Sequence, residues 1–101
     1  MHIVIVGAGA AGCFAAIALK RECPGAEVTL LERGIRPLAK VAITGGGRCN
    51  LTNSFKQVKS LEQVYPRGHR LMKRLFHRFS HKDVYEWFQN EGVKLVTQPD
   101  E

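Results

Sequence analysis

The residues with the clearest chemistry form one glycine-rich run near the N-terminus. Gly7, Gly9 and Gly12 occupy the three glycine positions of a G-x-G-x-x-G pattern. In that pattern the first glycine makes a tight turn, the second lets a pyrophosphate approach the backbone, and the third allows close helix–strand packing. The free N–H groups at the start of the following helix face the phosphates. The spacing therefore predicts a phosphate-binding loop built mainly from backbone.

The segments around this run match a βαβ nucleotide-binding unit. Ile3–Val6 is a β-branched apolar run, which predicts a strand buried on both faces of a parallel sheet. An Ala-rich helix is expected from Cys13 to about Arg21, and a second strand over Val28–Leu31. Glu32 follows that strand, where a carboxylate can accept hydrogen bonds from ribose hydroxyls. A glycine-rich turn in an ordinary α/β protein is the less favoured alternative, because all the flanking elements are present.

A second glycine-rich run spans Thr44–Asn53 and contains three consecutive glycines. Such a run loses much entropy on folding unless the backbone needs unusual dihedral angles or a very close approach. Successive N–H groups in a loop of this kind form a concavity that binds anions. Arg48 follows with a planar set of donors. A flexible surface linker is the alternative, but the cationic and polar residues after the glycines favour contact with a ligand.

Together, these segments resemble the bacterial BaiN-like flavoproteins, which are NAD(P)/FAD-dependent or aminoacetone-oxidase-like FAD-binding enzymes. Many FAD and NAD enzymes share the first glycine pattern, whereas the run K-x-x-x-T-G-G-G-R-C-N-x-T-N from Lys40 to Asn53 is more specific. The whole chain resembles only the N-terminal part of that family. The resemblance implies an α/β fold, namely the N-terminal part of a Rossmann-like FAD-binding domain. Its dinucleotide-binding core would span residues 1–53, and a two-helix segment and the start of a next strand would span 54–101.

The resemblance also implies a cofactor and its contacts. FAD would be held by the first glycine run at the pyrophosphate and by Glu32 at the adenosine ribose, while the second run lines the cofactor farther along. The expected chemistry is hydride or electron transfer through FAD, with NAD(P)H as reductant. No catalytic residue can be named, and the segment alone is expected to be inactive without its C-terminal remainder and a small-molecule substrate. The residues expected at the cofactor are Gly7, Ala8, Gly9, Ala10, Ala11, Gly12, Glu32, Arg33, Lys40, Thr44, Gly45, Gly46, Arg48, Cys49 and Asn50.

Beyond residue 53 the sequence favours helices. Val58, Leu61 and Val64 fall at helical spacing before Tyr65-Pro66. Ser80 followed by Asp83 is typical of a capping box. The further predicted elements are an amphipathic helix from Gly68 to about Phe79, a helix over Lys82–Asn90 with Gly92 at its C-cap, and a strand over Val93–Thr97.

The basic segment 67–82 suggests a different function. The net charge of +6 divides into +4 over residues 1–66, +6 over 67–82 and −4 over 83–101. A helical module with this charge could bind nucleic acid. We favour this less, because the next helix is acidic and its aromatic side chains share one apolar face. His77 and His81 have the i, i+4 spacing of a metal pair, but Ser80 interrupts the helix and no third ligand is near in sequence.

Composition limits the class of protein. A chain of 101 residues, 45% hydrophobic and 24% charged, suits one small soluble domain. The uncharged stretch Ile3–Leu19 is short for a membrane span and lacks the basic start of a signal peptide. Three cysteines without a C-x-x-C pair favour the reducing cytoplasm. The chain ends without a closing element, so we expect an N-terminal fragment of a longer cytoplasmic protein.

Overall fold

The computed structural model describes residues 1–98. The chain divides into two compact units, Met1–Asn50 and Leu51–Glu101, and the elements below are those of the described residues. The first unit contains two strands and two α-helices, and the second contains three helices. Among the described residues, no helix is both long and apolar enough to cross a membrane. The elements are β1 (His2–Val6), α1 (Ala10–Glu22), β2 (Glu27–Leu31), α2 (Ala39–Ile43), the 3-10 turn η1 (Gly45–Gly47), α3 (Leu61–Val64), α4 (His69–Arg78) and α5 (His81–Asn90).

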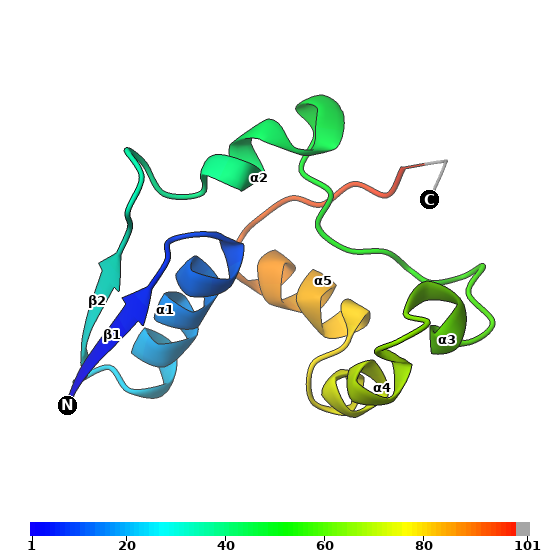
Figure 1. Ribbon diagram of the computed structural model, residues 1–101, viewed down its shortest axis with the longest axis horizontal. Coiled ribbons are helices and arrows are strands. Elements are labelled where there is room, and N and C mark those ends of the chain that lie inside the picture. The colour runs from blue at the N-terminus through cyan, green and yellow to red at the C-terminus, as the bar shows by residue number, and fades with distance from the viewer. Residues whose placement is uncertain (99–101) are drawn as a thin grey trace. The chain divides into compact units, whose positions relative to one another are not determined.

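The first unit is built on a parallel βαβ arrangement, as the sequence predicts. β1 pairs with β2 in parallel, with His2 opposite Glu27 at one end and Val6 opposite Leu31 at the other. α1 connects the two strands and packs against both, as Figure 1 shows. Both strands therefore end at the same edge of the sheet, next to the loop that leads into α1.

The core of this unit is small. Among the described residues, the buried apolar ones are Ala8, with 3% of its surface exposed, and Ala26, with 5%. Along β1, Ile3 and Ile5 are half-buried, whereas Val6 is 85% exposed. The prediction that this strand is buried on both faces is therefore wrong here, because α1 is the element of the first unit that packs on the sheet and it covers one face.

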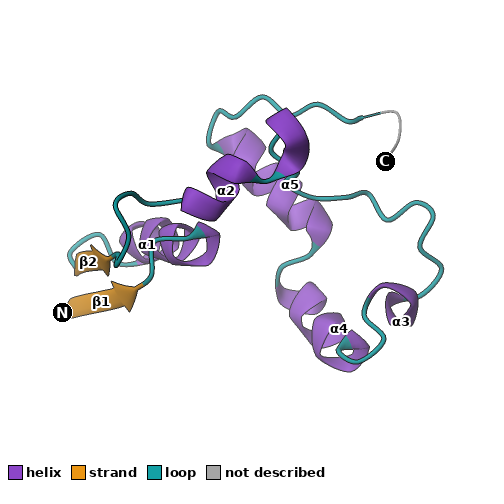
Figure 2. Ribbon diagram, turned by 45° about the horizontal axis from the view of Figure 1, so that its top comes forward, coloured by secondary structure: helices purple, strands orange, loops and turns teal. Residues whose placement is uncertain are grey.

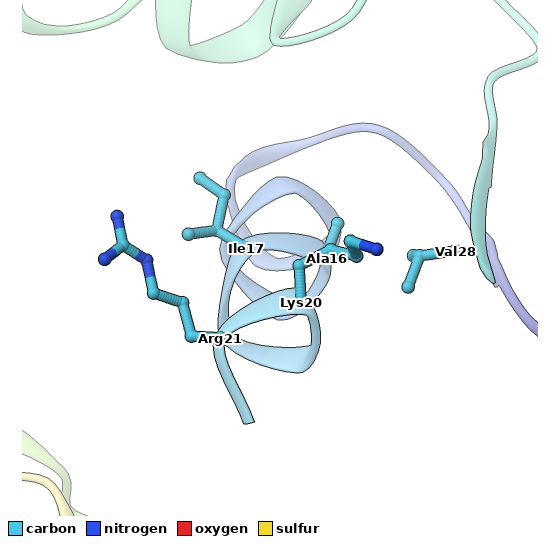
Figure 3. A pocket seen from close by; sticks show the side chains of 5 residues that line it. All are labelled: Ala16, Ile17, Lys20, Arg21 and Val28. Atoms are coloured by element: carbon cyan, nitrogen blue, oxygen red, sulfur yellow. The ribbon is translucent and has the colours of Figure 1, made fainter. Parts of the chain in front are cut away.

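An open hollow of about 380 Å³ lies between α1 and β2. Figure 3 shows Ala16, Ile17, Lys20 and Arg21 on α1 and Val28 on β2 around it. The Lys20 ammonium donates hydrogen bonds to the carbonyl oxygens of Pro24 at 3.0 Å and Ala26 at 2.9 Å. This side chain therefore joins the end of α1 to the turn that leads into β2.

The second unit is organised by an aromatic cluster. The ring of His81 stacks on Phe55, with centroids 4.5 Å apart and planes 12° from parallel. Phe76 of α4 lies 5.8 Å from Phe55 and 5.7 Å from His81. The Thr52 hydroxyl donates to the His81 carbonyl at 3.1 Å. The loop before α3 is thereby held against α4 and α5, the two consecutive helices seen in Figure 2.

Both ends of α5 confirm the sequence signals. The Ser80 hydroxyl accepts the Asp83 N–H at 3.2 Å, and the Asp83 carboxylate accepts the Ser80 N–H at 2.8 Å, which completes the capping box. At the other end Gly92 has φ +88°. Its N–H donates to Gln89 O at 2.9 Å, and Val93 N–H donates to Phe88 O at 3.0 Å. This is a Schellman ending, which needs a left-handed residue at the glycine position.

Two predicted elements differ from the structure. The strand expected over Val93–Thr97 is not formed; this segment is irregular, and Val96 is 72% exposed. A strand requires a neighbouring strand, and the described residues provide none for it.

The helical spacing of Val58, Leu61 and Val64 yields only the short helix α3, with Val58 outside it. The side chains of Asn53 and Ser54 accept the backbone N–H groups of Phe55 at 2.8 Å and Lys56 at 3.3 Å. These local hydrogen bonds compete with helix formation at that point.

Candidate functional site

The loop between β1 and α1 begins with the turn predicted at Gly7. This residue has φ +101°, a conformation that residues with a side chain rarely adopt. Its N–H donates to the Leu31 carbonyl at 2.7 Å, so the ladder between the strands extends one residue before the chain turns.

Gly9 and Gly12 face different surroundings. A Cβ atom at Gly12 would lie 1.9 Å from the Gly7 carbonyl oxygen, so only glycine lets α1 approach the turn this closely. A Cβ atom at Gly9 would meet nothing within 4 Å. The backbone at Gly9 is extended, with φ −84° and ψ −165°, and carries no left-handed strain. The space beside Gly9 is therefore open to a ligand, whereas Gly12 serves packing inside the protein.

The start of α1 has the properties of an anion site. Gly9 is the N-cap, no side chain caps the helix, and its first turn holds no acidic residue. Ala10 and Ala11 are exposed at this end. The first N–H groups of a helix lack partners within the helix and lie at the positive end of its dipole. A negatively charged group beside Gly9 would meet these donors.

Glu32, directly after β2, is tied to the same loop. One carboxylate oxygen accepts the Ala8 N–H at 3.0 Å, and the other accepts the Gly34 N–H at 2.6 Å. The Gly34 and Ala8 N–H groups, together with the charge of Arg33, hold the pKa of Glu32 below its ordinary value. Glu32 is therefore ionised at neutral pH. Ala8, which the sequence placed at the cofactor, directs its N–H to Glu32.

A cleft of about 580 Å³ lies at the carboxyl ends of the two strands. It is lined by Val6, Gly7, Leu31, Glu32 and Arg33. Open α/β sheets bind their ligands at this edge. The sequence prediction included three of the five lining residues and missed Val6 and Leu31. The sequence signal that could have placed them at the cleft is their position as the last residue of each strand.

The second glycine run has the unusual backbone that the sequence predicts. Gly45, Gly46 and Gly47 have φ values of +79°, +54° and +91°. The Arg48 N–H donates to the Gly45 carbonyl at 3.0 Å and closes the turn. Asn50 lies against Gly45, since a Cβ atom there would be 3.7 Å from the Asn50 nitrogen. Arg48, Cys49 and Asn50 are exposed, so they are accessible to a ligand.

The connection between the two glycine runs passes through α2. The Leu38 N–H donates to the Ala8 carbonyl at 2.7 Å, which starts α2 against the first loop. Leu38 has a φ of +56° and is therefore in the left-handed conformation, which the sequence did not indicate. Lys40 lies exposed on α2, and the Thr44 hydroxyl donates to Val41 O at 3.3 Å. Within residues 1–98 no hydrogen bond joins residues 45–50 directly to residues 7–12.

A parallel βαβ unit with a glycine turn, a close-packed helix and a carboxylate after its second strand is a Rossmann-type nucleotide-binding unit. The chain belongs to the HI0933-like protein family, whose Rossmann-domain model matches residues 1–101. This match confirms the Rossmann-like α/β fold and the resemblance to BaiN-like flavoproteins.

Curated relatives are consistent with membership of this family. The chain is 33% identical over 90 residues to the ribosomal RNA dihydrouridine synthase of Escherichia coli, covering 89% of this chain and 21% of that protein. It is 33% identical over 92 residues to the 3-dehydro-bile acid delta(4,6)-reductase of Clostridium scindens, covering 91% and 22%. A ribosomal RNA dihydrouridine synthase of Haemophilus influenzae is 44% identical over 50 residues, covering 50% and 12%.

The chain thus spans about a fifth of the length of the first two relatives. No solved structure matches the chain significantly.

Proposed function

We propose that this chain is the FAD-binding portion of a flavin-dependent oxidoreductase. The observation that carries the proposal is the open space at Gly9 beside the uncapped start of α1, with ionised Glu32 at the neighbouring strand end. The pyrophosphate would lie against Gly9 and the first N–H groups of α1. Each carboxylate oxygen of Glu32 has a second lone pair free to accept a ribose hydroxyl.

The second glycine run would line the cofactor farther along. Its glycines expose backbone without side chains, and Arg48 adds an accessible positive charge. The first-run residues in this proposal are Gly7, Ala8, Gly9, Ala10, Ala11 and Gly12, with Glu32 and Arg33 at the adenosine end. The second-run residues are Lys40, Thr44, Gly45, Gly46, Arg48, Cys49 and Asn50.

The names of the relatives suggest the reaction class. Dihydrouridine is uridine with its ring double bond saturated, and a delta(4,6)-reductase saturates a carbon–carbon double bond. We propose the same class for the protein to which this unit belongs: reduction of a double bond conjugated to a carbonyl, with NAD(P)H as electron source. Bound flavin supplies the hydride chemistry. The residues of this chain bind and orient the cofactor.

The test compares FAD binding by the 101-residue chain and by a variant that fills the proposed phosphate space. In Gly9→Val the new Cβ atom would meet no protein atom within 4 Å, so the fold should survive while the side chain excludes the pyrophosphate. Gly25→Val is the matched control, because Gly25 also has open space around it and lies in the turn before β2. Calorimetric titration with FAD should show at least about tenfold weaker binding for Gly9→Val and no change for the control.

Two results would contradict the proposal. Equal FAD affinity of the two variants would show that the first loop is not the phosphate site. Failure of the unsubstituted chain to bind FAD, combined with no flavin absorbance in the purified longer protein, would remove the flavin from the proposal altogether.

A further inference from the structure

The surface of α4 is the most strongly charged feature of the second unit. Arg70, Lys73, Arg74 and Arg78 are all exposed. At 100° per residue these four side chains lie on one side of the helix, in a row about 12 Å long. We call this row the α4 basic face. Arg67 before the helix and Lys82 after it extend the positive charge at both ends.

This charge is not balanced inside the unit. Within residues 1–98, none of the four side chains forms an ion pair with a carboxylate, and no acidic residue lies between 67 and 82. Like charges at i, i+4 on a helix, as at Arg70/Arg74 and Arg74/Arg78, destabilise it. The negative end of the helix dipole favours only the cations of its last turn. The row therefore costs helix stability, and this cost disappears when an anion binds along it.

The opposite, apolar side of α4 contributes Phe76 to the aromatic cluster of the second unit. Phe76 lies on the apolar side and contacts Phe55 and His81 at 5.8 and 5.7 Å between ring centroids. The basic face must then point away from this cluster, because cations and apolar residues occupy opposite sides of one helix. A helix with a row of exposed cations suits a long, regularly charged partner better than a single small anion.

We propose that the α4 basic face binds the phosphate backbone of RNA. Three of its four cations are arginines, whose planar donors pair with phosphate in bidentate fashion. The proposal rests on the proposed function, since it selects RNA from the two substrate classes named for the relatives. The sequence alone led us to favour nucleic-acid binding less, because the helix that follows the basic segment, α5, is acidic. That objection concerned base recognition by α5, whereas contact with phosphates needs only α4.

The test measures RNA binding by the 101-residue chain as a function of salt. The probe is a labelled single-stranded RNA of about 20 nucleotides containing uridines, followed by fluorescence anisotropy. Neutralising four phosphates on a single strand predicts a slope of about −3 in log K against log salt. Affinity should therefore fall about 60-fold between about 50 and 200 mM salt.

A pair of triple variants with the same loss of charge isolates the α4 basic face. The first variant carries Arg70→Gln, Lys73→Gln and Arg74→Gln. The control carries Lys56→Gln, Lys59→Gln and Lys94→Gln, three exposed cations of the same unit outside α4. The first variant should lose at least about tenfold in affinity at low salt and reduce the slope to about −1, while the control retains the slope.

The outcomes separate this proposal from the flavin proposal. FAD titration of the α4 variant should match the unsubstituted chain, and Gly9→Val should bind RNA normally while losing FAD. Equal RNA affinity of the α4 variant and its control would overturn the RNA surface and leave FAD binding unaffected. Binding to vesicles of anionic phospholipid without binding to RNA would also overturn it and assign the face to a membrane surface.

Discussion

The carboxylate of Glu32 accepts the backbone N–H of Ala8 at 3.0 Å across 24 residues of sequence. This contact fastens the end of β2 to the glycine loop that follows β1. Its second oxygen holds the Gly34 N–H, where the chain leaves the sheet. The Glu32 side chain thus fixes the glycine loop and the adenosine end of the proposed site. The charge of this carboxylate therefore affects the shape of both regions.

Acidification should release this contact. The pKa of Glu32 is held below its ordinary value of 4.5, chiefly by the Gly34 and Ala8 N–H groups. A carboxyl group whose pKa is lowered by folding contributes stability above its unfolded pKa, and this is lost as the pH falls through the folded value. The amide resonances of Ala8 and Gly34 should therefore titrate together in NMR spectra, with a midpoint below 4.5. In Glu32→Gln both resonances should be independent of pH over that range; a titration that persists there would assign the change to another group.

Gly12 and Gly9 should respond in opposite ways to the same substitution. In Gly12→Ala the new methyl group would lie 1.9 Å from the Gly7 carbonyl oxygen, which forces α1 away from the turn. We expect a loss of about 3 kcal/mol in the free energy of unfolding of the first unit, at the upper end of overpacking costs. Gly9→Ala meets no protein atom and should leave the far-UV circular dichroism and the thermal midpoint close to those of the unsubstituted chain. Similar midpoints for the two variants would show that α1 can shift without cost.

The features of the fold that the sequence predicts well are local. The β1 and β2 runs, the helix between them and the ends of α5 follow from apolar spacing, glycines and the Ser80–Asp83 capping pair. The positive φ angles of Gly45–Gly47 were likewise expected from three consecutive glycines.

The features that could not be predicted from the sequence depend on contacts between residues far apart in the chain. The segment Val93–Thr97 has the composition of a strand, but pairing depends on a neighbour that the described chain does not place beside it. The hydrogen-bond partners of Glu32 could not be predicted either, because nothing in the sequence indicates that its carboxylate accepts the Ala8 N–H. Local signals predict elements, whereas the contacts between elements decide which atoms of a site remain available to a ligand.

Chemical labelling of Cys49 tests whether the second glycine run reaches the cofactor. Cys49 is exposed and follows Arg48, whereas Cys23 is half-buried after α1. If the second run lines FAD as proposed, saturating FAD should slow alkylation of Cys49 by iodoacetamide several-fold, because the bound cofactor blocks access to the thiol. Mass spectrometry of the labelled peptides gives both rates in one sample, and the rate at Cys23 should not change. The protection should disappear in Gly9→Val, which removes FAD without touching the second run. Unchanged labelling of Cys49 in a chain that demonstrably binds FAD would restrict the cofactor site to the first loop and Glu32.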